Sequence, residues 1–278
     1  MALVPFPTQN RDEEQNLPAK PGGFSPFGDD EEPAGEGRMT FLEHLDELRK
    51  RITHAVGGLL VGFIVAFAFI NRVQAFIYER LTKDIPNGKL IFTEPGEGFM
   101  LMIKMAALTG VLIASPYIML QVWLFIAPGL YANEKRLAIP FVFLSTLGMV
   151  GGAVFNHYIM FPWMMSFFAS FNTQDLVFMP KLDSVFSIYT KFLIAMAVVF
   201  QMPTLVFFLA KMKLVTARFL IAKFKYALLI IFILSAVITP TGDPVTQVVF
   251  AAPMVGLYLL GIVIAWVVGP KRLRDATA

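Results

Sequence analysis

The sequence feature that most constrains this chain is a series of long apolar runs separated by short charged segments. Crossing the hydrocarbon core of a bilayer takes a helix of about 20 apolar residues, because each residue adds about 1.5 Å. Five of the six runs have this length, and turns or charged residues bound them. The sequence therefore predicts an all-α, polytopic membrane protein whose six transmembrane helices form one domain over residues 39–270. The expected spans are residues 52–71, 99–126, 137–161, 185–210, 224–239 and 245–268.

The composition supports a membrane protein and excludes several kinds of site. Charged residues make up 15% of the chain and hydrophobic residues 56%, whereas soluble domains carry about 25% charged residues. The absence of cysteine excludes disulfides, thiolate metal sites and cysteine nucleophiles. The three histidines, His44, His54 and His157, are too scattered to predict a metal site. We therefore expect no cofactor and no metal, and the alternation of basic residues with apolar runs does not indicate nucleic acid as a partner.

The basic residues predict the orientation of the chain in the membrane. If sides alternate from the N-terminus, 16 Lys and Arg residues fall on one side and 5 on the other. The positive-inside rule then places both termini in the cytoplasm. The basic stretch 211–225 contributes to this count, and the sequence suggests no further function for it.

Two terminal segments are predicted to lie outside the membrane domain. Residues 1–38 are rich in Pro and Gly, carry an acidic cluster at 29–32, and lack the basic and apolar regions of a signal peptide. We expect a disordered cytoplasmic tail there. Residues 271–278 form a short C-terminal tail, which we also expect to be cytoplasmic.

The fifth apolar run is short for a transmembrane helix. The uncharged stretch between Lys225 and Asp243 has 17 residues, and its last three, 240–242, already belong to the turn at 240–244. A helix of this length is shorter than the hydrocarbon core, which is about 30 Å thick. We therefore expect the bilayer to thin around this span, or one helix end to lie in a water-filled recess.

The segment before the first span has the pattern of an amphipathic helix. Thr40 and Glu43 have the spacing of a capping box, which predicts a helix start at Thr40. Glu47 and Arg51 are one turn apart and are expected to pair. One interpretation is an interfacial helix with self-paired charges. The apolar stripe of this segment is Phe41, Leu45, Leu48 and Ile52.

A second carboxylate favours a binding role for this segment. Glu134 lies in the short loop between the second and third spans, on the same predicted side of the membrane as Glu47. Phe125, Pro128 and Tyr131 are close to it in the sequence. Two carboxylates beside apolar groups suit a ligand with paired guanidinium groups next to an apolar segment, because Arg binds carboxylates in a bidentate manner.

Four motifs, in order, resemble those of the TatC family, the signal-recognition subunit of the twin-arginine protein translocase. The motifs are HLDELRKR at 44–51, the stretch at 115–136 that contains QVWLFIAPGLY and EKR, FQMP at 200–203, and TPTGDP with Gln247 at 239–247. The resemblance covers residues 40 to 270 and implies a TatC fold with a concave, membrane-embedded face. It also implies a core receptor subunit, and not an enzyme, in the bacterial inner membrane.

The resemblance assigns roles to residues in each motif. Glu47 and Glu134 are expected to contact the twin arginines of the signal peptide, with the other residues of the site nearby. Pro240 and Asp243 are expected in the periplasmic turn before the last helix. The remaining signal-peptide-binding residues are His44, Arg49, Phe125 and Tyr131.

Two polar residues inside the spans are further candidates. Gln201 stands where the commonest form of the family has glutamate. Because an amide cannot titrate, we do not expect Gln201 to carry protons, and we expect its amide to bind a polar partner either within the chain or on a partner helix. Lys104 either extends to the interface or pairs with Glu94 or Glu97, and anchoring and function both remain open.

The resemblance also names partners and an energy source. The partners are twin-arginine signal peptides of folded precursors, TatA- and TatB-type single-span subunits, membrane lipid, and further copies of this chain. The chain lacks a nucleotide-binding motif, so any energy is expected to come from partners or from the proton gradient, and the resemblance implies the proton gradient. A secondary transporter of a small solute is the alternative, but the two halves show no internal repeat. An intramembrane enzyme would need a base–nucleophile or metal-ligand constellation, which the sequence does not show.

Overall fold

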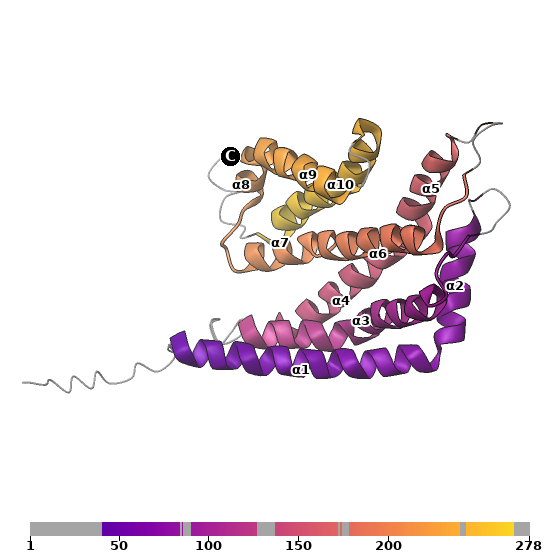
Figure 1. Ribbon diagram of the computed structural model, residues 1–278. Helices are drawn as coiled ribbons and strands as arrows, with labels where there is room; N and C mark the ends of the chain where they lie inside the picture. Colours follow the sequence, from indigo (N-terminus) through magenta and orange to yellow (C-terminus); the bar gives the residue numbers. More distant parts are fainter. Residues whose placement is uncertain are drawn as a thin grey trace, which may run out of the picture. The chain divides into compact units, whose positions relative to one another are not determined.

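The computed structural model is built almost entirely of α-helices (Figure 1). It describes residues 41–83, 85, 90–126, 137–171, 173, 178–239 and 243–269. The helices are α1 (Phe41–Ala68), α2 (Ile70–Lys83), α3 (Glu97–Ile126), α4 (Ala138–Phe155), the π-helical turn Asn156–Met160, α5 (Phe161–Ala169), α6 (Leu182–Val199), α7 (Met202–Lys211), α8 (Ala217–Ala222), α9 (Phe224–Ile238) and α10 (Pro244–Val268). Strands are absent from these residues, which confirms the predicted all-α class. The predicted tails, 1–38 and 271–278, lie outside the described residues.

Five helical stretches are long and apolar enough to cross a membrane. Helix α9 is also apolar, but its 15 residues extend only about 22 Å. This helix covers the run that the sequence marks as short, so the sixth crossing stays a prediction. The five long stretches are Leu42–Ala68, Glu97–Ile126, Ala138–Ala169, Leu182–Lys211 and Pro244–Val268.

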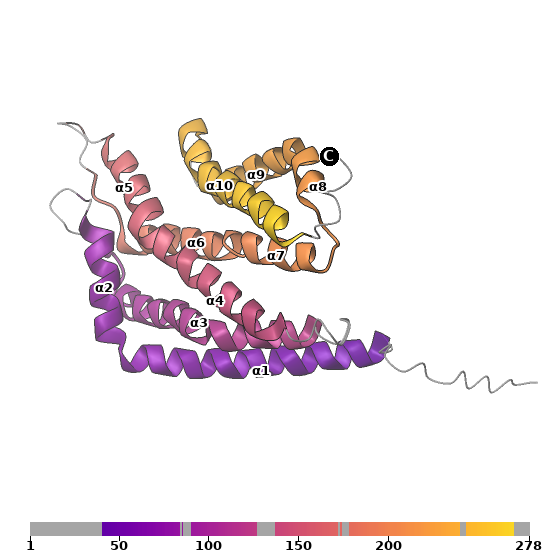
Figure 2. The same cartoon turned by 180° about the vertical axis from the view of Figure 1, so that it is seen from behind.

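Helices α1 and α3 lie side by side along most of their length (Figures 1 and 2). Glycines make this close approach possible: a Cβ on Gly62 would lie 2.4 Å from the carbonyl oxygen of Gly110. One turn earlier, a Cβ on Gly58 would lie 2.4 Å from the ring of Tyr117. The small residues let the two backbones touch. The contact fixes how the first turns of α1 face the last turns of α3.

Helix α4 runs diagonally from α3 to α6 and contacts both (Figure 2). Its contact with α6 again depends on glycine. A Cβ on Gly152 would lie 2.5 Å from the carbonyl oxygen of Met196, and one on Gly148 would lie 2.8 Å from that of Phe200. Helix α4 therefore joins the α1–α3 pair to the second half of the chain.

Helix α2 occupies a segment in which the sequence predicts only the end of the first span and a turn-rich connection. The helix is interrupted at Phe69, and α2 then begins at Ile70 and runs for 14 residues. Its apolar residues recur at helical spacing and pack on a core that includes Leu101, Phe161 and Phe186. The charged residues among them explain why the segment resembles a loop in the sequence. The core-facing residues of α2 are Ile70, Val73, Ile77 and Leu81.

The third span does not end at Pro162, as its sequence suggested. The helix continues through the π-helical turn into α5 and ends at Ala169. At the π turn, the Phe161 N–H donates to the Asn156 carbonyl, five residues back. Pro162 has no N–H to donate. In a regular α-helix the Phe161 N–H, and in a π-helix the N–H of residue 162, would bind the His157 carbonyl. Neither donor is available to it here.

Arg80 of α2 binds the carbonyls at this irregular turn. Its Nε donates to the His157 carbonyl over 2.9 Å, and its Nη2 donates to the Tyr158 carbonyl over 3.3 Å. Unsatisfied backbone carbonyls are costly in a membrane protein. Arg80 explains why a proline and a π turn are tolerated inside this helix.

Candidate functional site

The first turns of α1 carry the Glu47 carboxylate next to α3. Arg51 Nε donates to Glu47 Oε1 over 2.6 Å, as the sequence spacing predicts. Arg51 Nη1 also reaches Gln121 Oε1 of α3 at 3.5 Å. The Glu47 and Arg51 side chains are only 18% and 23% exposed. The pair is thus partly shielded from water, and Gln121 ties it to the neighbouring helix.

The two oxygens of Glu47 have different surroundings. Arg51 Nε and Nη2 both contact Oε1. Among the described residues, Oε2 has no hydrogen-bond partner. A carboxylate has lone pairs on both oxygens and can accept bonds from two guanidinium groups. Glu47 therefore retains an acceptor for a further cation.

An aromatic contact lies beside this carboxylate. His44, one turn before Glu47, stacks on Phe125 of α3, with ring centroids 4.5 Å apart and planes inclined by 25°. The contact brings the predicted residues His44, Glu47 and Phe125 to the same ends of α1 and α3. The stack therefore places aromatic surface one helical turn from the carboxylate along α1.

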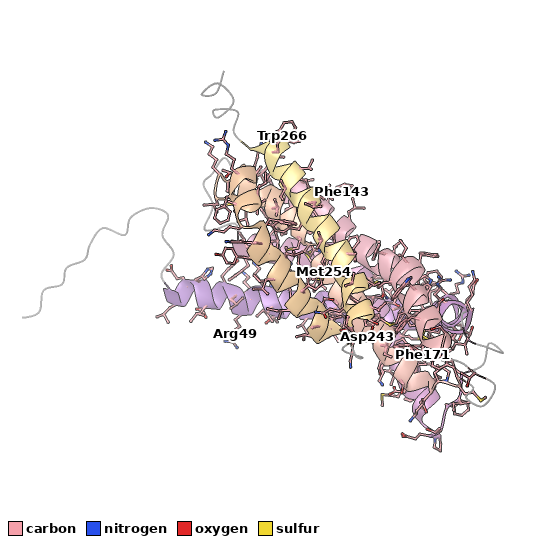
Figure 3. All side chains as sticks on the ribbon, turned by 90° about the horizontal axis from the view of Figure 1, so that it is seen from above. Arg49, Phe143, Phe171, Asp243, Met254 and Trp266 are labelled. Atoms are coloured by element: carbon pink, nitrogen blue, oxygen red, sulfur yellow. The ribbon has the colours of Figure 1, made fainter. Side chains whose placement is uncertain are left out.

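Arg49 does not join this group. Its side chain is exposed and projects from α1 (Figure 3). Glu134 and Tyr131 lie outside the described residues, as does Pro240. The convergence of Glu47 and Glu134 therefore stays a prediction.

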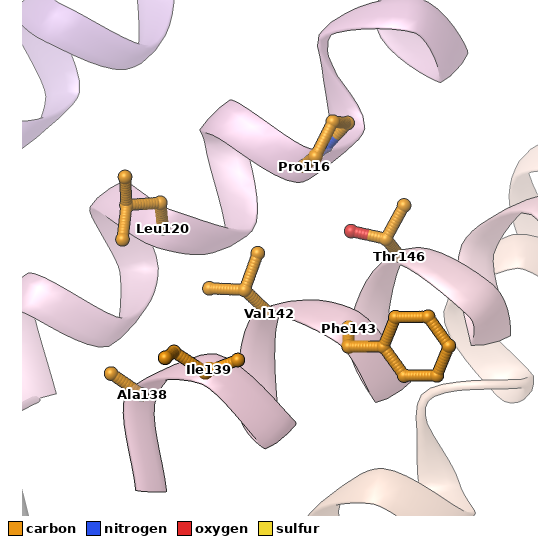
Figure 4. Close-up of a pocket in the computed structure, with 7 residues that line it drawn as sticks. All are labelled: Pro116, Leu120, Ala138, Ile139, Val142, Phe143 and Thr146. Carbon is orange, nitrogen blue, oxygen red and sulfur yellow. The ribbon is translucent and has the colours of Figure 1, made fainter. Parts of the chain in front are cut away.

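An apolar groove of about 370 Å³ lies between α3 and α4 (Figure 4). Residues near the end of α3 form one wall and the first turns of α4 form the other. The Thr146 hydroxyl, on the α4 side, is buried without a hydrogen-bond partner in the described part of the chain. The groove residues are Pro116, Leu120, Ala138, Ile139, Val142, Phe143 and Thr146.

Gln201 lies at the break between α6 and α7. Its Nε2 donates to the Ser145 carbonyl of α4 over 2.9 Å. The side chain is half-buried. The structure thus gives the amide a partner within the chain, and the contact to a separate partner helix stays a prediction.

Lys104 has a different partner from those that the sequence suggested. Its Nζ lies 2.6 Å from Asp183 Oδ1 at the start of α6. Glu97 instead accepts from the backbone N–H groups of Thr93 and Asp183, over 3.0 and 2.9 Å. Glu94 pairs with Lys181 at 3.4 Å. These contacts join the start of α3 to the start of α6. The ion pair with Asp183 therefore gives Lys104 a structural role in joining the two helices.

Asp243 caps the last helix. Its Oδ2 accepts from the Thr246 N–H and its Oδ1 from the Thr246 hydroxyl, both over 2.7 Å. This is the arrangement of an N-cap. Figure 3 labels Asp243 at the start of α10 and Trp266 near its end.

Sequence reasoning missed a polar contact between α9 and α10. Ser235 of α9 donates to the Gln247 carbonyl over 2.5 Å, and Gln247 Nε2 donates to the Phe232 carbonyl over 2.9 Å. The isolated Ser235 in an apolar run and the polar Gln247 one turn into α10 were the available signals. The contact anchors the short helix α9.

The described residues contain no group of three His, Asp or Glu side chains placed to hold a metal ion. The polar contacts above join helices to each other, and the Glu47 site has the chemistry of cation binding.

Comparisons with known proteins agree with the motifs. The model of the family "Sec-independent protein translocase protein (TatC)" matches residues 43–253. A Koribacter versatilis protein of that name is 38% identical over 242 residues, covering 85% of this chain and 88% of the relative. One from Helicobacter pylori is 41% identical over 227 residues, covering 82% and 89%.

Solved structures show the same fold. A crystal structure of the twin arginine translocase receptor TatC superposes with a TM-score of 0.69 at 33% identity, covering 80% of this chain and 97% of that one. A second crystal structure, of the same receptor in DDM, gives 0.70 at 33% identity, covering 80% and 99%. The family is a component of a protein translocase and not an enzyme. The chain, a multi-pass membrane protein, therefore belongs to the TatC family.

Proposed function

We propose that this chain is the core receptor of the twin-arginine translocation system and binds twin-arginine signal peptides at the cytoplasmic face. The observation that carries the proposal is the state of Glu47. Arg51 holds one of its oxygens, while the other has no partner among the described residues. One guanidinium of the signal peptide binds this oxygen.

The surroundings of Glu47 support an amphipathic ligand. The His44–Phe125 stack offers aromatic surface to the apolar segment that follows the arginines. Glu134 supplies the acceptor for the second guanidinium, and Tyr131 lines the same site. Each charge-assisted bond contributes about 1.5–3 kcal/mol. Two arginines bound in this way discriminate against lysines, which lack the bidentate fork.

The rest of the proposal concerns topology and partners. Both termini lie in the cytoplasm of a bacterium, with six crossings of the inner membrane. The receptor recruits TatA- and TatB-type single-span subunits and further copies of itself, and the assembly exports folded proteins by using the proton gradient. Gln201 contributes to a partner-helix contact through the part of its amide that does not bind Ser145.

Binding of a signal peptide to the purified full chain in detergent tests the proposal. The peptide with Arg-Arg is expected to bind tenfold or more tightly than the Lys-Lys peptide, as about 1.5–3 kcal/mol per lost charge-assisted bond implies. Glu47→Gln is expected to remove about half of this free-energy difference, because the second guanidinium still binds Glu134. Asp46→Asn changes an exposed carboxylate of the same helix and serves as the matched control. Equal binding of both peptides to the wild type contradicts the proposal.

A further inference from the structure

The connection between α7 and α9 concentrates positive charge without any carboxylate. Its cations are all exposed or partly exposed, and the sequence has no Asp or Glu from residue 184 to residue 242. The positive-inside rule explains why such residues lie on one side of a membrane. It does not explain the structure that they form. The five cations are Lys211, Lys213, Arg218, Lys223 and Lys225.

Large apolar side chains are exposed among these cations. Leu214, Phe219 and Ile221 are 66%, 52% and 60% exposed. They belong to α8 and the turn before it, which are too short to cross a bilayer. Cations interspersed with exposed apolar side chains are typical of segments that lie in the interface of a membrane, with the apolar groups inserted between lipids.

One face of this segment is fixed on the protein. Leu220 is buried, and its carbonyl accepts a hydrogen bond from the Tyr258 hydroxyl of α10 over 2.9 Å. At the start of α8, the Thr216 hydroxyl oxygen accepts from the Phe219 N–H over 3.3 Å. The Tyr258 bond holds α8 against α10, and the Thr216 cap fixes the first turn of α8. The cations and the exposed apolar groups are therefore presented outward on a defined surface.

Two of the cations share one aromatic ring. Lys223 Nζ lies 5.4 Å from the centroid of the Tyr226 ring, and Lys225 Nζ lies 5.0 Å from it. Tyr226 is exposed. Both ammonium groups thus lie close to the same ring, and the ion pairs among the described residues include no carboxylate that neutralises them. Anionic phosphates bound at these ammonium groups would neutralise them.

We infer that residues 211–226 form a binding surface for anionic phospholipids of the surrounding bilayer. The cations bind headgroup phosphates, with Lys223, Lys225 and Tyr226 at the centre, while Leu214, Phe219 and Ile221 insert beside the acyl chains. Charge complementarity and the exposed apolar groups favour lipid over an acidic protein segment, which would leave those apolar groups in water. The inference is independent of signal-peptide binding.

Electron paramagnetic resonance with spin-labelled lipids tests this inference on the full chain in nanodiscs. The motionally restricted fraction of labelled phosphatidylglycerol is compared with that of labelled phosphatidylcholine. The wild type is expected to select phosphatidylglycerol, and the selectivity falls as the salt concentration rises. Lys223→Gln with Lys225→Gln is expected to lower the selectivity by about fivefold per lost charge at low ionic strength.

Two control variants separate the surface from general charge effects. Lys223→Arg with Lys225→Arg keeps the charges and is expected to keep the selectivity. Arg72→Gln with Lys83→Gln removes two exposed cations of α2 and is also expected to keep it. The inference is overturned if the glutamine pair at 223 and 225 selects phosphatidylglycerol like the wild type, or if the α2 pair loses selectivity equally. Absence of selectivity in the wild type, with binding of an acidic peptide instead, overturns it in favour of a protein partner.

Discussion

Arg51 donates from Nε to Oε1 of Glu47 over 2.6 Å and leaves Oε2 without a partner among the described residues. The two side chains are one turn apart on α1, and Gln121 of α3 lies 3.5 Å from Arg51 Nη1. Arg51 thus orients the carboxylate without covering it. An exposed glutamate on a helix surface would not have this defined orientation.

Replacing Arg51 by lysine tests its role as a positioning residue. Lysine keeps the charge but makes one contact in place of the two that Arg51 makes with Oε1. Arg51→Lys is expected to weaken Arg-Arg peptide binding about two- to fivefold, which corresponds to about 0.5–1 kcal/mol for a partly exposed pair. Calorimetric titration measures the effect. A loss as large as that of Glu47→Gln would show that Arg51 itself contacts the ligand.

The α1–α3 contact predicts a sharp difference between two glycines of α1, Gly62 and Gly57. A Cβ at Gly62 meets the Gly110 carbonyl at 2.4 Å, whereas a Cβ at Gly57 meets nothing within 4 Å. Gly62→Ala is therefore expected to destabilise the protein by about 1–3 kcal/mol. Gly57→Ala is expected to be neutral or to stabilise it by up to about 1 kcal/mol. Thermal unfolding in detergent compares the two, and equal midpoints would refute the close packing.

The contact of Arg80 with the π-helical turn predicts coupling to Pro162. Arg80→Met leaves the His157 and Tyr158 carbonyls without this donor and is expected to cost about 1–3 kcal/mol. Pro162→Ala restores a backbone N–H near the same carbonyls, so Arg80→Met should cost less in that background. Unfolding of the four proteins in a double-mutant cycle measures the coupling. Strictly additive losses would mean that the proline and the arginine act independently.

Gln201 is expected to contribute to stability through α4. Gln201→Leu removes the 2.9 Å bond to the Ser145 carbonyl and should destabilise the protein by about 0.5–1.5 kcal/mol. Met202→Leu, at the adjacent residue, is a volume-conserving control. Chemical cross-linking from residue 201 to single-span subunits in native membranes measures the proposed partner contact. If Gln201→Leu leaves the free energy of unfolding unchanged, the hydrogen bond to Ser145 does not contribute to stability.

Sequence periodicity was sufficient for elements whose residues are uniformly apolar. The helices over 97–126 and 244–268 agree with predicted spans, and the Glu47–Arg51 pair follows from helical spacing alone. Residues four apart lie one turn apart in every α-helix, so the pairing of Glu47 with Arg51 does not depend on how the helices pack. The four motifs indicate the family for a similar reason, because each is a short, contiguous stretch of the chain.

The sequence was less informative where the polar groups of one segment bind groups of a distant segment. Pro162 resembles a helix end in the sequence because the donor that makes it tolerable, Arg80, is about 80 residues away in the chain. Lys104 pairs with Asp183, which is closer in space than Glu94 or Glu97 only after α3 and α6 have packed. Such partners depend on tertiary packing, which periodicity does not encode. Of the predicted binding site, the structure describes the residues of α1 and α3, while Glu134 and Tyr131 lie outside the described residues.

A double-mutant cycle between Glu47 and the arginines of the signal peptide tests the central claim most directly. Four dissociation constants are measured, for wild type and Glu47→Gln against the Arg-Arg and Lys-Lys peptides. If a guanidinium binds the free oxygen of Glu47, the two changes are expected to be coupled by about 1.5 kcal/mol or more, so that the preference for Arg-Arg falls by that amount in Glu47→Gln. Additive losses, with the arginine preference unchanged in Glu47→Gln, would contradict the claim.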